Sequence, residues 1–125
     1  MKRTILPILA ATVWISISEF VRNQFLLQSY WTEHYGGLGL SFPAAPINGA
    51  VWGVWSLLFA GVIYVLRTRF DLRETFVLSW FIGFVMMWVV IGNLGVLPFG
   101  ILPAALPLSM LEAFGAVWIV GKLRA

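Results

Sequence analysis

Three ionisable side chains lie inside long apolar stretches of the sequence. Glu19 and Arg22 stand three residues apart, and Glu112 lies near the other end of the chain. An ionisable group at the centre of a bilayer costs at least about 2.5 to 3.5 kcal/mol, so each is expected to face protein or water. Residues three apart are neighbours on a helix, and we therefore expect Glu19 and Arg22 to form an ion pair. These groups could exchange a proton or bind an ion or a polar solute.

A stripe of polar side chains accompanies this pair on one helix face. At about 100° per residue the stripe covers about 60° of arc. It consists of Thr12, Ser16, Glu19 and Asn23. One interpretation is a polar cavity open to the outer side, with Glu19 as its protonatable or cation-binding group. The alternative is a structural fastening, in which Asn48 and Asn93 hydrogen-bond to the Glu19–Arg22 pair.

Glu112 lies about 14 Å from the end of the last apolar stretch, close to mid-membrane. Its helix face also carries Ala105, Ser109 and Ala116, which are small enough to permit close helix approach. We expect Glu112 to have no cationic partner and to act as a proton carrier. The alternative is a protonated carboxyl that donates one hydrogen bond to a neighbouring helix.

The remaining composition restricts the chemistry further. Cysteine is absent, which excludes disulfides, thiolate catalysis and thiolate metal sites. The single histidine, His34, argues against a histidine-based metal site. The sequence contains no phosphate loop, nucleophile elbow or dinucleotide fingerprint. We therefore predict no metal, no cofactor and no catalytic residue.

The elements that position these groups are expected to be membrane-spanning helices. The chain has 125 residues, of which 61% are hydrophobic and only 10% charged, so polar residues are too few to cover a soluble core. A span needs about 20 mostly apolar residues, and the chain offers four. We predict an all-α polytopic membrane protein with a single domain over residues 1–125 and spans at about 4–27, 47–66, 74–92 and 103–121. Asp71 and Glu74 form a plausible capping pair where the third span begins.

The basic residues predict the orientation of these spans. Seven of the eight fall at one side of the predicted bundle, and they are Lys2, Arg3, Arg67, Arg69, Arg73, Lys122 and Arg124. The positive-inside rule makes that side cytoplasmic. We therefore expect an antiparallel up-down bundle in the cell membrane with both termini in the cytoplasm. Because the basic residues flank apolar runs, the net charge of +3 indicates topology, and we predict no nucleic-acid partner.

Two further segments have a predicted place in the bundle. The outer loop over residues 28–46 carries aromatic side chains that favour the headgroup zone, so we expect it to lie along the outer interface. Small residues follow one face of the second span, at Gly49, Gly53, Ser56 and Ala60. In lipid such a face is typical of close helix packing, either inside the subunit or between subunits.

Three classes of function remain for a small bacterial-type integral membrane protein. The best supported is transport or binding of a proton, an ion or a small lipophilic solute through a polar site near the outer face. Because four helices enclose little volume, this class requires a homo-oligomer. The alternative is an accessory or assembly subunit of a larger membrane complex, indicated by the short loops. An enzyme acting on a membrane lipid, with Glu19 as general acid or base, has the least support. Membrane lipids are expected partners in every case.

Overall fold

The computed structural model describes residues 2–124. Over this range all the regular secondary structure is helical, and no strand is present. Four helices are long and apolar enough to cross a membrane. They cover Lys2–Leu26, Pro46–Arg67, Leu72–Asn93 and Phe99–Arg124. The predictions of an all-helical chain and of four such helices are therefore confirmed.

Three of the four long helices contain a change of helical geometry. The first consists of α1 (Lys2–Phe20) followed by the π-helical turn η1 (Val21–Leu26). The third consists of α4 (Leu72–Trp80), the π-helical turn η2 (Phe81–Val85) and α5 (Met86–Asn93). The fourth begins with the 3-10 turn η3 (Phe99–Ile101) and continues as α6 (Leu102–Arg124), whereas α3 (Pro46–Arg67) is regular throughout. Single π-helical turns inside α-helices are frequent at functional sites.

Local side-chain contacts explain where α4 and α3 begin. The Glu74 amide donates to Asp71 Oδ1 at 2.8 Å and the Asp71 amide to Glu74 Oε1 at 3.4 Å, so the predicted capping pair is confirmed. At the start of α3, the Ala45 amide donates to Asn48 Oδ1 at 3.1 Å. Pro46 then occupies the first turn, where its missing amide hydrogen costs nothing.

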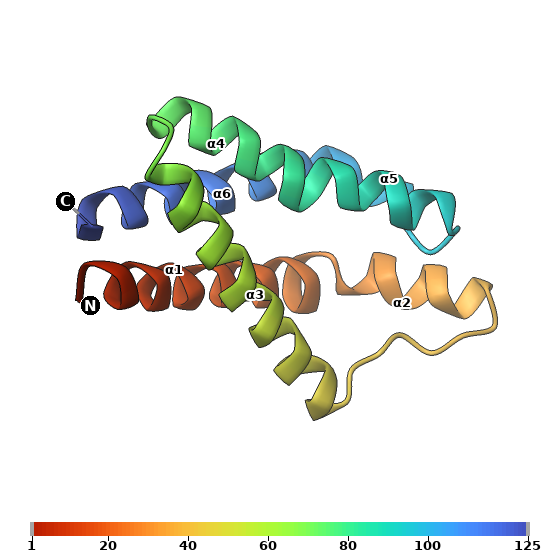
Figure 1. Cartoon of the computed structure of the whole chain (residues 1–125). Helices are drawn as coiled ribbons and strands as arrows, with labels where there is room; N and C mark the ends of the chain where they lie inside the picture. The colour runs from red at the N-terminus through yellow and green to blue at the C-terminus, as the bar shows by residue number, and fades with distance from the viewer. Residues whose placement is uncertain (1, 125) are drawn as a thin grey trace.

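The two chain ends lie at the same end of the molecule (Figure 1). Helix α1 packs against α6 and α3, while α4 packs against α6. Helix α3 crosses the others at an angle, and its first turns diverge from α1 (Figure 1). The apolar core lies where these helices meet and consists of Ala11, Ile15, Phe59, Ala60, Ile63, Phe84, Ala113, Ala116, Val117 and Val120. The divergence of α3 leaves space beside α1 at the end of the molecule away from the termini.

The connection predicted as a loop over residues 28–46 contains a fifth helix, α2 (Gln28–Gly37). It continues along the line of α1, and the chain then returns to the start of α3 (Figure 1). The rings of Trp31 and Tyr35 in α2 pack against Phe42 of the returning segment, with centroids 5.7 and 5.2 Å apart. His34 Nε2 also lies 2.8 Å from the Gly95 carbonyl oxygen. These contacts give the segment a packed structure that hydropathy alone does not predict.

Candidate functional site

The centre of the candidate site is one arginine held between two carboxylates. Arg22 Nη2 lies 2.8 Å from Glu19 Oε2, which confirms the predicted pair, and Arg22 Nη1 lies 2.9 Å from Glu112 Oε1. All three side chains are buried, with exposures of 5% for Glu19, 6% for Arg22 and 1% for Glu112. The prediction that Glu112 lacks a cationic partner is therefore wrong. The long Arg22 side chain joins α1 to α6, bringing together groups that we expected to act at separate depths.

Both π-helical turns meet at this arginine. Arg22 belongs to η1, where its carbonyl accepts a hydrogen bond from the Leu27 amide at 2.9 Å. Its guanidinium carbon lies 5.1 Å from the ring centroid of Phe84, which belongs to η2. A guanidinium at this distance from a ring is attracted by the π face. The irregular turns of two helices thus surround the same buried charge.

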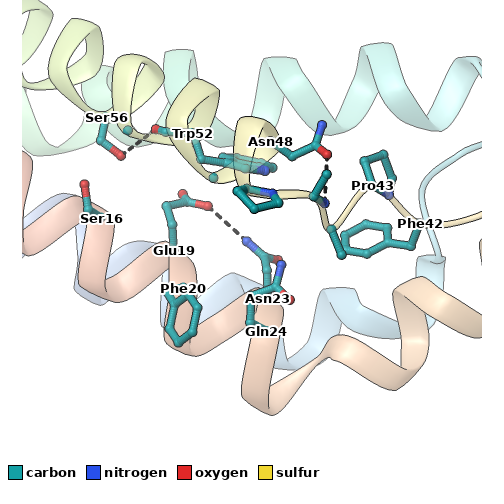
Figure 2. Close-up of a pocket in the computed structure, with 15 residues that line it drawn as sticks. Ser16, Glu19, Phe20, Asn23, Gln24, Phe42, Pro43, Asn48, Trp52 and Ser56 are labelled. Atoms are coloured by element: carbon teal, nitrogen blue, oxygen red, sulfur yellow. Dashed lines mark hydrogen bonds between the residues drawn. The ribbon is translucent and has the colours of Figure 1, made fainter.

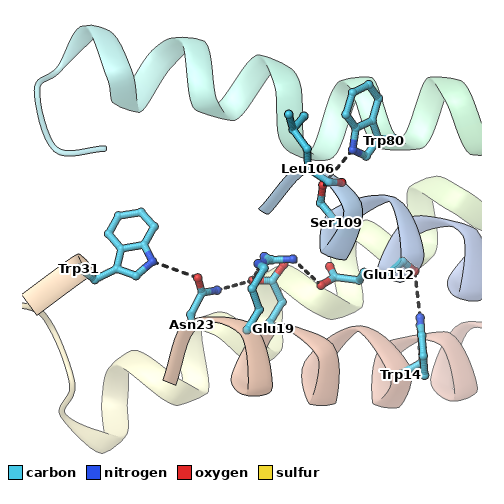
Figure 3. A network of polar contacts seen from close by, with 9 residues as sticks. Trp14, Glu19, Asn23, Trp31, Trp80, Leu106, Ser109 and Glu112 are labelled. Atoms are coloured by element: carbon cyan, nitrogen blue, oxygen red, sulfur yellow. Dashed lines mark hydrogen bonds and ion pairs between the residues drawn. The ribbon is translucent and has the colours of Figure 1, made fainter. Parts of the chain in front are cut away.

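A chain of hydrogen bonds leads from this cluster to α2 (Figure 3). Trp31 Nε1 donates to Asn23 Oδ1 at 3.1 Å, and Asn23 Nδ2 donates to Glu19 Oε2 at 3.0 Å. Because an indole can only donate, it orients the Asn23 amide so that the amide nitrogen faces Glu19. Asn23 therefore supports the carboxylate that receives the arginine.

Asn48 and Asn93 do not make the hydrogen bonds to the Glu19–Arg22 pair that the structural alternative predicted. The Asn48 side chain instead caps the start of α3. Asn93 is exposed at the end of α5, and its side chain makes no hydrogen bond within residues 2–124. Asn48 lines the same cavity as Glu19, but its side-chain oxygen accepts the Ala45 amide instead, and Asn93 lines neither of the cavities that Glu19 lines.

Contacts on the other side of the cluster hold α6 in place. Trp14 Nε1 donates to the Glu112 carbonyl oxygen at 2.9 Å, and Trp80 Nε1 donates to Ser109 Oγ at 2.9 Å. A β-carbon added at Gly115 would lie 2.5 Å from the Trp14 indole. Glycine is thus needed there for α1 and α6 to approach, as the small residues on this face predicted.

The cluster has an unbalanced charge. With both carboxylates ionised, two negative charges face one positive charge, which leaves a net charge of −1. Glu19 Oε1 and Glu112 Oε2 are buried and have no hydrogen-bond partner among the described residues. Buried unpaired charge is costly in an apolar environment. The cluster therefore favours the binding of one proton, or of one ligand that donates a hydrogen bond.

A cavity of about 400 Å³ lies between α1 and the diverging start of α3 (Figure 2). Its polar lining residues include Ser16, Glu19, Asn23 and Asn48, three of which belong to the predicted stripe. Thr12, the fourth member of that stripe, is not among the lining residues, and its hydroxyl donates to the Ile8 carbonyl of its own helix at 2.7 Å. Gln24 and Ser56 add two further polar groups, and the rest of the lining comes from Phe20, Phe42, Pro43, Ala44, Ala45, Pro46, Gly49, Trp52 and Gly53.

A second cavity of about 200 Å³ adjoins the first. Glu19 and Asn23 line both, so the carboxylate lies on the boundary between them. The second cavity also contacts Arg22 and is rich in aromatic rings, contributed by Trp31, Tyr35, Phe42, Trp52 and Trp88. A small pocket that is mostly apolar and has a few convergent polar groups is typical of ligand binding.

The small-residue face of α3 has two different environments. Ser56 and Ala60 are fully buried, which matches the predicted packing face. Gly49 and Gly53 instead line the larger cavity, and a β-carbon added at either would have no atom within 4 Å. These glycines therefore keep space open beside Glu19.

The aromatic lining was not among the candidates that the sequence indicated. Trp31 was expected to lie at the outer interface, and Phe42, Trp52 and Trp88 were given no part in the site, because nothing in the local sequence distinguishes a ring that lines a cavity. The divergence of α3, which opens the larger cavity, has no counterpart in the sequence pattern.

Comparison with protein-family models, with curated proteins and with solved structures gives no match. The function must therefore be inferred from the geometry of the site.

Proposed function

We propose that this chain is an integral protein of the cell membrane that binds and transports a small lipophilic solute through a polar site in the outer half of the bilayer. Glu19 receives the polar head of the solute or exchanges a proton with it. The remaining part of the solute occupies the apolar cavity beside α3. Both the transport and the solute are proposals drawn from the geometry of the site.

The orientation that we propose is an antiparallel bundle with cytoplasmic termini. The distribution of basic residues supports this orientation. The two termini lie at the same end of the molecule (Figure 1), and seven of the eight basic residues lie near the termini or at the connection between the second and third spans. The chain has no cysteine, so single-cysteine labelling has no background. In intact cells, Ser41→Cys should react with a membrane-impermeant maleimide and Thr68→Cys should not. The opposite pattern would refute the proposed orientation.

The observation that carries the proposal is the unpartnered Oε1 atom of Glu19. Glu19 is 5% exposed, lines both cavities and belongs to a cluster whose net charge is −1 when both carboxylates are ionised. A group with this burial would normally have every oxygen hydrogen-bonded. Because Glu19 lines the cavities, a ligand that reaches its carboxyl group can supply the missing donor.

Flux measurements in vesicles test the proposal. Purified protein reconstituted into liposomes should carry a solute across the membrane, with flux that depends on external pH, and Glu19→Gln should abolish that dependence. Glu33→Gln serves as the matched control, because it makes the same chemical change at an exposed carboxylate that lines neither cavity. Flux unchanged in both Glu19→Gln and Glu112→Gln would refute a role of this cluster in transport.

A second candidate, an accessory subunit whose buried charges serve only stability, is favoured by one observation. Arg22 is paired on both sides and ties α1 to α6. If this is its whole role, purification in mild detergent should return the chain with a larger membrane partner. A homogeneous species without a partner would argue against it.

A further inference from the structure

The site offers a ligand one buried acceptor atom without a hydrogen-bond partner, a net charge of −1 when both carboxylates are ionised, and an apolar cavity beside them. From these three features we infer that the solute is an amphipathic amine: a protonated nitrogen with at least one N–H bond, carried on an apolar tail. The inference rests on the proposed function and names its substrate class. It identifies Glu19 Oε1 as the atom that accepts the N–H hydrogen bond.

Anionic head groups do not fit the cluster. Within residues 2–124, Arg22 is the only cation that lines either cavity, and it lines the smaller one. Each of its terminal nitrogens already contacts a carboxylate, at 2.8 and 2.9 Å. An anion would have to displace Glu19 or Glu112 and would then lie beside a second negative charge. Like charges at this distance repel strongly in a low dielectric.

A bare metal ion does not fit either. Hard cations require about six oxygen ligands, and transition metals require several nitrogen, oxygen or sulfur donors. Within residues 2–124 no group of three or more His, Cys, Asp or Glu side chains could hold one. Glu19 supplies a single free oxygen, which matches a head group that needs one strong acceptor.

The aromatic lining distinguishes a cationic head from a neutral one. Trp31, Tyr35, Trp52 and Trp88 line the smaller cavity next to Glu19. A ligand ammonium within about 6 Å of such rings is attracted by their π faces, an attraction that a hydroxyl head does not gain. The carboxylate adds a charge-assisted hydrogen bond, which is stronger than a neutral one. An amine should therefore bind better than an alcohol of the same length.

The N–H requirement distinguishes among the cations themselves. A quaternary ammonium is attracted by the rings and by the net charge, but it has no hydrogen to donate to Glu19 Oε1. It would leave that buried oxygen unpaired, a penalty that corresponds to about a 5- to 150-fold loss of affinity relative to a primary amine.

The tail has a defined place beside the head. Gly49 and Gly53 leave open space along α3, and Phe20, Pro46 and Trp52 add apolar surface to the same cavity. Two sources could supply this chemistry: a free alkylamine, or the ethanolamine head group of a membrane phospholipid. Both present an N–H-bearing ammonium on an apolar tail.

Calorimetric titration of the full chain in phosphatidylcholine nanodiscs tests the inference, because that lipid has no N–H. The probes are octylamine, octyltrimethylammonium and octanol. We expect saturable binding of one octylamine per chain, at least fivefold weaker binding of octyltrimethylammonium, and the weakest binding for octanol. Glu19→Gln, which keeps the size of the side chain, should weaken octylamine at least tenfold. The comparison of probes on the unaltered chain does not depend on the folding of any variant.

A second set of nanodiscs identifies the source. In these nanodiscs phosphatidylethanolamine replaces a third of the phosphatidylcholine. If octylamine binding weakens in proportion to the phosphatidylethanolamine content, the lipid head group is the ligand. Unchanged octylamine binding indicates a free amine. Octanol binding as tightly as octylamine, with a loss in Gly53→Leu, would overturn the amine inference but leave the solute cavity intact. Absence of saturable binding by all three probes would overturn the proposed function as well.

Discussion

Replacing Arg22 by methionine should destabilise the protein more than any other single change in the site. Methionine keeps most of the side-chain length but removes the cation from between two carboxylates that are 5% and 1% exposed. Removing one partner of a buried ion pair costs about 3 to 5 kcal/mol, since the other partner remains as an uncompensated charge. Here two carboxylates lose the same partner.

The structure also sets an upper limit on the loss of stability in Arg22→Met. The two losses cannot simply add, because both carboxylates share one guanidinium and either can be neutralised by taking up a proton. We therefore expect about 3 to 5 kcal/mol in total, which lowers the folding equilibrium constant about 100- to 4000-fold. The triple variant Glu19→Gln, Arg22→Met, Glu112→Gln should recover at least half of the loss, since it leaves no charge in the cluster.

Reversible unfolding in mixed micelles of dodecyl maltoside and sodium dodecyl sulfate measures these differences. The seven tryptophans give a strong fluorescence signal for the transition. Arg69→Met is the matched control, since Arg69 is exposed and should change stability by no more than about 0.5 kcal/mol. An Arg22→Met variant as stable as the control, or a triple variant less stable than the single one, would refute the reasoning.

Two further predictions concern the groups that surround the cluster. Gly115→Ala should lower the free energy of unfolding by about 1 to 3 kcal/mol, because its β-carbon would lie 2.5 Å from the Trp14 indole. Gly61→Ala is the control, since a β-carbon added there has no atom within 4 Å. In the same unfolding assay it should raise the free energy of unfolding by up to about 1 kcal/mol. Equal effects would contradict the close approach of α1 and α6. Trp31→Phe removes the donor to Asn23 and should cost about 0.5 to 1.5 kcal/mol, while Tyr30→Phe, outside that chain of hydrogen bonds, should leave stability unchanged.

The number and nature of the long helices could be predicted because lipid imposes a simple rule. A segment that crosses a bilayer must satisfy its backbone internally and must be apolar for about 20 residues, so hydropathy identifies it. Local side-chain chemistry was equally accessible: the Asp71–Glu74 cap and the Glu19–Arg22 pair each depend on a spacing of three residues. Such features are encoded within one turn of one helix.

The rest of the site depends on packing between helices and was not predictable in the same way. Arg22 and Glu112 are 90 residues apart in sequence and meet because α1 and α6 approach closely at Gly115. The cavity exists because α3 diverges from α1, an angle that no periodicity in the sequence specifies. Asn23, not Asn48 or Asn93, supports Glu19, since Trp31 in the unpredicted helix α2 fixes the orientation of its amide.

Filling the cavity without touching the charged cluster tests the central claim most directly. Gly53 lines the cavity and Gly61, on the same helix, does not, yet a β-carbon has free space at both. Octylamine binding should be at least tenfold weaker in Gly53→Leu than in the unaltered chain, and unchanged in Gly61→Leu. Binding to Gly53→Leu with the affinity of the unaltered chain would contradict the claim that this cavity holds the solute.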